Sequence, residues 1–203
     1  MKNQQRGPGR FGLFPEEFDH IWRIMLEAFP PEERRNRQGM EAILDDPLFR
    51  LLYRRDAQGC PAAFLTYWEL DGMRYVEHFA VSSSLRGHGM GSLLLKEFMG
   101  QDTTPVILEV EPPETQTARR RIDFYKRLGF CLNDYPYLQP PLQPGMPSIP
   151  LQLMSAPGPL SPTEFQTARE ELYTKVYRRR PTMSNRLNGA GEESRPEKSD
   201  GNH

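Results

Sequence analysis

Residues 73–92 of the 203-residue chain read MRYVEHFAVSSSLRGHGMGS, and this stretch decides the fold. Its first part, Met73–Val81, is rich in aromatic and β-branched residues, which predicts a β-strand. The turn Arg86–Gly91 then leads into a predicted helix over Gly89–Met99. Glycines leave backbone N–H groups open, and a helix N-terminus carries partial positive charge. With the guanidinium of Arg86 added, the stretch predicts an anion-binding turn between a strand and a helix.

The spacing of the glycines excludes two nucleotide-binding motifs. Gly87, Gly89 and Gly91 form GxGxG, whereas the dinucleotide-binding fingerprint is GxGxxG. The phosphate-binding P-loop requires a lysine after its last glycine, but Gly91 is followed by Ser92 and Leu93. A GxGxG turn by itself also fits a tight connection without a ligand. The neighbouring elements must therefore decide between these two interpretations.

Working outward, the hydrophobic patterns predict helices and strands on both sides of this turn. The Asp71-Gly72 pair is typical of a hairpin turn between consecutive antiparallel strands. Consecutive antiparallel strands followed by crossovers predict an α+β fold rather than a doubly wound sheet. Before the turn we expect a helix at Pro15–Phe29, a short helix within Glu32–Leu44, and strands at Phe49–Arg55 and Ala62–Leu70; after it, a strand at Pro105–Glu111, a helix from Thr115 or Thr117 to about Leu128, and strands at Phe130–Leu138 and Ile149–Met154.

The sequence divides into four predicted segments. Residues 1–14 are expected to be a flexible N-terminus, and residues 15–154 to form the folded domain. Nine of the 20 prolines fall between Pro136 and Pro162, which predicts a connector outside the core. Ser161, Pro162 and Glu164 form a capping-box signature for a last helix, so residues 155–180 are a connector and a C-terminal helix. Residues 181–203 are expected to be a disordered tail.

The composition argues against several classes of protein. A net charge of −1 argues against a general nucleic-acid binder. Two cysteines, Cys60 and Cys131, and four scattered histidines form no disulfide framework and no metal-ligand pattern. No apolar run is long enough for a membrane span, and the N-terminus lacks the apolar region of a signal peptide. We therefore expect a cytoplasmic protein with no metal, nucleic-acid or membrane partner.

Two motifs together resemble the GNAT superfamily of acetyl-CoA-dependent N-acetyltransferases. Arg86-x-x-Gly89-x-Gly91 matches that family's [Q/R]xxGxG/A signature, and EHFAV before it is similar to the family's central strand. The later RRRIDFYKRLGF, Arg119–Phe130, resembles the second cofactor segment, in which a helix carries a tyrosine. The resemblance covers residues 14–154. It implies a mixed, mostly antiparallel sheet, flanked by helices and splayed at the cofactor site.

The resemblance also implies the site residues. Pantetheine of acetyl-CoA would lie along Phe79, Ala80 and Val81. The pyrophosphate would sit on the turn formed by Arg86, Gly87, His88, Gly89, Met90, Gly91 and Ser92. Acetyl would pass directly from the thioester to a primary amine within a ternary complex. That reaction requires a base for the amine, a donor to the oxyanion and an acid for the thiolate.

Three residues are the candidates for these catalytic roles. Glu77 shares strand parity with Phe79, and Glu109 lies among apolar residues that could raise its pKa, so both remain candidate bases. A backbone N–H near Phe79 is the simplest donor to the oxyanion. Tyr125 is the candidate acid, since the family places its tyrosine in this FYxxxGF context.

The sequence departs from the family pattern at the start of that later helix. An asparagine and a small residue are usual there, and Ala118 and Arg121 stand in their places, so one common cofactor contact is missing. The run Arg119–Arg121 is either a substitute phosphate contact or a solvated helix face. A non-catalytic acyl-CoA-binding module with a partner-binding C-terminal helix is therefore the alternative function. The acyl group, the acceptor (a small molecule or a protein amine) and a homodimeric state stay open.

Overall fold

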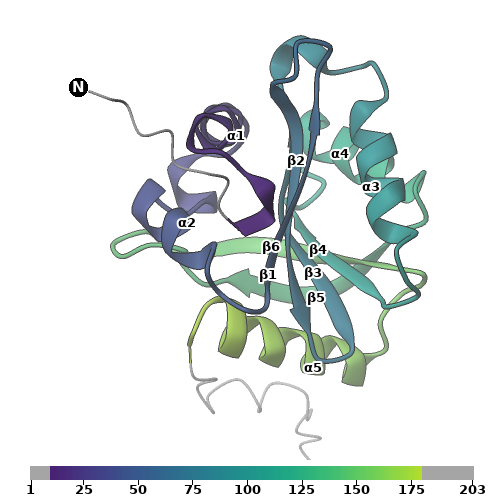
Figure 1. The fold of residues 1–203 in the computed structure, drawn as a ribbon. Helices are drawn as coiled ribbons and strands as arrows, with labels where there is room; N and C mark the ends of the chain where they lie inside the picture. The colour runs from purple at the N-terminus through teal and green to yellow at the C-terminus, as the bar shows by residue number, and fades with distance from the viewer. Residues whose placement is uncertain (1–9, 180–203) are drawn as a thin grey trace, which may run out of the picture.

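A computed structural model describes residues 10–179, which form one six-stranded sheet and five α-helices (Figure 1). The strands run in the order β1-β2-β3-β4-β6-β5. Within the described residues, β3 and β4 pair in parallel and every other neighbouring pair is antiparallel. This confirms the predicted α+β class with a mixed, mostly antiparallel sheet. The strands are β1 Phe49–Arg55, β2 Pro61–Leu70, β3 Met73–Val81, β4 Val106–Val110, β5 Cys131–Gln139 and β6 Ile149–Ala156.

The two faces of the sheet support two separate hydrophobic clusters. Strand residues alternate between faces, so Ile107 joins one cluster while Val106 and Leu108 join the other. Helices α1 (Pro15–Ala28), α2 (Arg37–Ile43) and α5 (Pro162–Glu171) contribute to the first cluster. Helices α3 (Met90–Met99) and α4 (Gln116–Lys126) cover the opposite face (Figure 1). The sheet is therefore enclosed on both sides.

The prediction that the proline-rich segment lies outside the core is wrong. Strand β6 is inserted between β4 and β5, and its residues Leu151, Leu153 and Met154 are buried. The segment can be both proline-rich and central because Pro150 is exposed at the start of the strand, and other prolines fall in the loop between β5 and β6. The domain boundary predicted at residue 154 consequently falls inside β6.

The C-terminal helix packs on the protein's own sheet. The Ser161 hydroxyl accepts a hydrogen bond from the Glu164 N–H at 3.3 Å, and the Glu164 carboxylate accepts one from the Ser161 N–H at 2.7 Å, which confirms the predicted capping box. Helix α5 continues as one π-helical segment, Leu172–Val176. Its apolar stripe belongs to the same cluster as α1; the stripe is Phe165, Ala168, Leu172 and Val176.

Ordered packing extends past the predicted N-terminal boundary as well. Leu13 is buried in the first cluster, so the folded part begins before Pro15. Residues 1–9 of the predicted flexible N-terminus, and the whole of the predicted tail at 181–203, lie outside the described residues.

The sheet opens between β3 and β4. The two strands pair at three positions and stop at Val76 opposite Leu108. On the other side of β3, Thr66 of β2 pairs with His78 while the next residue, Tyr67, pairs with Val76, which leaves Glu77 as a bulge. A bulge bends its strand and increases the local twist. Beyond Val76 the paired region of β3 and β4 ends, and the predicted splay is confirmed.

Truncating the apolar anchor of α5 should destabilise the whole fold. Phe165 is 2% exposed and packs against Tyr135 and Tyr137. We expect Phe165→Ala to lower the free energy of unfolding by about 3–5 kcal/mol, measured by chemical denaturation. Leu93→Ala on α3 is the control, since Leu93 is 55% exposed and its truncation should cost no more than about 0.5 kcal/mol. Equal losses in the two variants would contradict the docking of α5.

Candidate functional site

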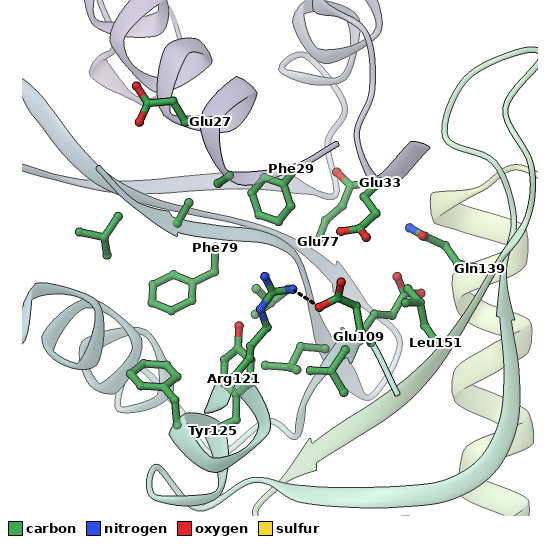
Figure 2. A pocket seen from close by; sticks show the side chains of 18 of the residues that line it. Glu27, Phe29, Glu33, Glu77, Phe79, Glu109, Arg121, Tyr125, Gln139 and Leu151 are labelled. Atoms are coloured by element: carbon green, nitrogen blue, oxygen red, sulfur yellow. Dashed lines mark hydrogen bonds and ion pairs between the residues drawn. The ribbon is translucent and has the colours of Figure 1, made fainter. Parts of the chain in front are cut away.

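A cavity of about 340 Å³ lies where β3 and β4 separate (Figure 2). It brings together all three predicted catalytic side chains, Glu77, Glu109 and Tyr125. It also includes part of the predicted cofactor set, namely Phe79, Ala80, Val81 and Arg86. The remaining predicted cofactor residues, 87–92, are not in the cavity wall and instead form the loop and first helical turn that follow Arg86.

The glycine-rich turn has the geometry of an anion cradle. Gly87 and Gly89 adopt positive φ angles of 83° and 79°, which favour glycine. A Cβ added at either position would meet no atom within 4 Å, so the surface of the turn is open. Gly89 is the N-cap of α3, and Leu93 N–H makes the helical bond to its carbonyl at 3.0 Å. The N–H groups of residues 90–92 precede that bond and have no partner within the helix.

Gly91 has a different role from the other two glycines. A Cβ at this position would lie 3.2 Å from both the Phe79 ring and the Val81 side chain. Glycine therefore allows the first turn of α3 to approach β3 closely. Arg86 is tied to the same strand, because its Nε donates to the Val81 carbonyl at 3.2 Å. His88 is exposed, and its Nδ1 lies 3.0 Å from the Arg86 carbonyl oxygen, so the imidazole stays within the turn.

The free edge of β3 presents backbone groups to the cavity. His78 N–H donates to the Thr66 hydroxyl at 3.1 Å, and Ser82 N–H donates to the Ala62 carbonyl at 2.8 Å. Both bonds run toward β2. Because successive N–H groups of a strand alternate in direction, those of Phe79 and Val81 point the other way, toward the opening. An extended ligand can bind along this edge as an added strand would.

Glu109 of β4 carries an unusual carboxyl group. Burial raises its pKa to about 7, although hydrogen bonds from tyrosine hydroxyls act to lower it. Tyr177 donates to its two oxygens at 2.8 and 2.9 Å, and Tyr137 donates to the Oε1 atom. A base is most effective when its pKa lies near the working pH. Glu109 can therefore take up a proton from a ligand at neutral pH.

Glu77 is held in a different environment. Its side chain is 1% exposed, and its Oε1 lies 2.8 Å from Nη2 of Arg35. The same Arg35 nitrogen donates to the Val176 carbonyl at 3.2 Å. Removing one partner of a buried ion pair leaves an uncompensated charge, so this glutamate has a structural task. Of the two predicted bases, Glu109 has the environment that suits proton transfer better.

Tyr125 reaches the cavity from α4 (Figure 2). Burial raises the pKa of its hydroxyl to about 12, opposed by the nearby Arg121. The hydroxyl is therefore protonated at neutral pH and available as a proton donor. Of the basic run Arg119–Arg121, Arg121 lines the cavity and pairs with Glu111 at 3.1 Å. Arg119 instead donates to the carbonyls of Pro113 and Glu114.

Several site residues carry no signal in the sequence. Glu33 and Gln139 line the cavity, and Tyr137 and Tyr177 bind Glu109, yet the four residues come from three separate segments. A strand pattern indicates the alternation around Tyr137 but not what its hydroxyl contacts. In residues 10–179 no cluster of three or more potential metal ligands is found. Nor does that part of the chain contain a helix long and apolar enough to cross a membrane.

Comparison with known proteins agrees with this geometry. Residues 14–130 match the model of the Acetyltransferase (GNAT) family. Over 108 residues the chain is 34% identical to the Bacillus subtilis protein named "Putative acetyltransferase YjbC"; the match covers 52% of this chain and 54% of that protein, so the chain spans about half the length of this curated relative.

Solved structures extend the comparison to the fold. A structure described as "Putative acetyltransferase from GNAT family from Bacteroides thetaiotaomicron" is 34% identical, with a TM-score of 0.73 over 80% of this chain and 92% of that one. The ribosomal-protein-S18-alanine N-acetyltransferase from Escherichia coli shares the fold at 18% identity, with a TM-score of 0.52 over 73% of this chain and 92% of that one.

The raised pKa of Glu109 should make stability depend on pH. The carboxyl titrates near 4.5 in the unfolded chain and about 7 in the folded protein, so its contribution is fully present below pH 4.5 and is lost as the pH rises through 7. The loss amounts to about 3 kcal/mol. We expect the unfolding free energy of the wild type, relative to Glu109→Gln, to fall by this amount between pH 4.5 and 8. Leu93→Ala is the control: it removes an exposed side chain without a titratable group, so the wild type relative to this variant should show no such change with pH.

Proposed function

The chain belongs to the GNAT acetyltransferase family, and we propose that it is an N-acetyltransferase that moves the acetyl group of acetyl-CoA to a primary amine by direct attack. The observation that carries this proposal is the cavity itself. It joins an anion-binding turn, an open strand edge, a glutamate that titrates near neutrality and a protonated tyrosine. These are the parts that the transfer requires.

The residues of the turn fit the diphosphate of acetyl-CoA. The open surface above Gly87 and Gly89 leaves room for a phosphate, and the start of α3 supplies N–H donors and a positive helix end. Arg86 lies in the cavity wall beside this turn. We propose that the edge of β3 at Phe79–Val81 holds the pantetheine arm. Acetyl-CoA supplies a thioester whose acyl carbon an amine can attack.

The side chains then divide the proton transfers between them. Glu109 takes up the proton that the attacking amine must lose, because an ammonium has no lone pair. A backbone N–H near Phe79 stabilises negative charge on the acyl oxygen. Tyr125 donates its proton to the departing thiolate. The nitrogen loses a second proton as the amide forms, and this proton restores the Tyr125 hydroxyl. The proton held by Glu109 passes to solvent as the products leave, so both residues return to their starting states.

The alternative of a non-catalytic module was based on the missing asparagine and on the appended C-terminal helix and tail. The apolar stripe of that helix is buried against the sheet, and the tail at 181–203 lies outside the described residues. The missing asparagine contact is weaker support for the alternative, because Ala118 is packed in the core and Arg121 lines the cavity. A cytoplasmic location stays a prediction, and the identity of the amine and a homodimeric state stay open.

Turnover of acetyl-CoA with a panel of amines tests the proposed activity. If Tyr125 is the acid, Tyr125→Phe should lower kcat by about 10²–10⁴-fold while the fold is retained. Tyr53→Phe is the matched control, since Tyr53 lies on β1 and is not part of the cavity wall. A fall in kcat of less than a few-fold for Tyr125→Phe would remove the residue from the proposed role.

The pH dependence of turnover tests the assignment of Glu109. A base must be deprotonated to act, so kcat/KM should increase with pH and level off above about 7, the pKa of this carboxyl. Glu109→Gln should abolish this increase of kcat/KM with pH and lower kcat/KM by about 10²-fold or more. If the increase with pH persists unchanged in Glu109→Gln, the base is another group, and Glu77 is then the next candidate.

A further inference from the structure

The last turn of the C-terminal helix carries a hydroxyl that meets the catalytic carboxyl. Tyr177 is buried, and its hydroxyl oxygen lies 2.8 and 2.9 Å from the two oxygens of Glu109. The same oxygen lies 3.1 Å from the Tyr75 hydroxyl and 3.2 Å from Nε2 of Gln139. Four polar contacts from β3, β4 and β5 thus converge on one hydroxyl from the C-terminal segment.

The chemistry of the partners fixes the direction of these hydrogen bonds. The Gln139 amide nitrogen can only donate, so the Tyr177 oxygen accepts from it. The Tyr177 proton is then free for Glu109, whose carboxylate can only accept. Tyr137 donates to the same carboxylate from β5. Two neutral hydroxyls therefore hold the carboxylate, and such bonds favour the charged form over the protonated one.

We propose that Tyr177 is a positioning residue for the transfer reaction: its hydroxyl keeps the Glu109 carboxylate charged and in one orientation, so that docking of the C-terminal helix completes the site. The catalytic role of Tyr177 in this inference rests on the proposed function, whereas the effect of Tyr177 on the Glu109 carboxyl does not. Both Tyr137 and Tyr177 lie beyond residue 130, where the match to the family model ends.

The same helical turn also supports the second glutamate. Nη2 of Arg35 binds the carbonyl of Val176 at 3.2 Å and Oε1 of Glu77 at 2.8 Å. The residue before Tyr177 therefore anchors the cation that neutralises Glu77. Both candidate bases of the site are therefore connected to one turn of the C-terminal helix. Displacing that turn would alter the charge balance at two positions at once.

The groups that face Glu109 determine the sign of the expected effect. Tyr75 and Glu77 come from β3, Tyr137 from β5, and Tyr173 and Tyr177 from the C-terminal helix. Burial and the charge of Glu77 raise the pKa of Glu109, whereas the hydroxyls of Tyr137, Tyr177 and Tyr75 lower it. Loss of the Tyr177 hydroxyl leaves the raising effects less opposed. The pKa of Glu109 should therefore increase in Tyr177→Phe.

Two readouts on the full-length protein test this inference. The first is the titration of the Glu109 carboxyl carbon by NMR, assigned from its absence in Glu109→Gln. The second is the pH profile of kcat/KM. In Tyr177→Phe both should move to higher pH by about one unit or more. In the matched control Tyr173→Phe, both should remain in place. Tyr173 lies one turn earlier on the same helix, and its hydroxyl donates to the Leu138 carbonyl of β5 rather than to Glu109.

Tyr137→Phe provides a second variant from a different element. Its hydroxyl also donates to Glu109, so this variant should move the titration in the same direction. The ring that packs against Phe165 of the C-terminal helix is retained in it. Unchanged titration of Glu109 in a folded Tyr177→Phe protein would overturn the inference, and so would an equal shift in Tyr173→Phe. If the titration moves as expected but no amine is acetylated, the proposed function fails while the effect of Tyr177 on the carboxyl stands.

Discussion

The end of strand pairing at Val76 and Leu108 is the constraint on which the site depends. A parallel pair that continued along β3 would use the N–H groups of Phe79 and Val81 within the sheet. It would also close the space in which Glu109 and Tyr125 face a ligand. The bulge at Glu77 makes the interruption possible, because it bends β3 while the strand stays paired to β2 on its other edge. The opening therefore removes the hydrogen bonds that β3 and β4 would form beyond Val76 and Leu108, and it provides both a binding edge and a cavity.

The carboxyl of Glu109 shows how two opposing effects set a useful pKa. Burial alone favours the neutral acid, which cannot accept a proton from an amine. A cation beside the carboxylate would have the opposite effect, because it would lower the pKa and make the carboxylate a weaker base. The tyrosine hydroxyls have an intermediate effect, and the result is a pKa of about 7.

Local patterns predicted the helices and strands of the fold well. The strand Met73–Val81, the glycine turn and the helix α4 are each continuous stretches of sequence, so periodicity and spacing could indicate them. The pantetheine and pyrophosphate contacts and the role of Tyr125 came from the resemblance to the family, and they stay predictions. The prediction that the proline-rich segment lies outside the core was wrong, because composition does not show that Pro150 is exposed while Leu151 and Leu153 are buried. The partners of Glu109 could not be predicted either, since their meeting depends on β6 being inserted between β4 and β5.

The position of β6 explains why the C-terminal segment reaches the reaction site at all. With β6 beside β4, strand β5 becomes the edge, and α5 can pack across the face that also supports α1. Its π-helical end then places Tyr177 under Glu109 and the Val176 carbonyl beside Arg35. The Tyr177 hydroxyl lies within 3 Å of both carboxylate oxygens. The helix thus couples the packing of one core cluster to the protonation of a group in the cavity.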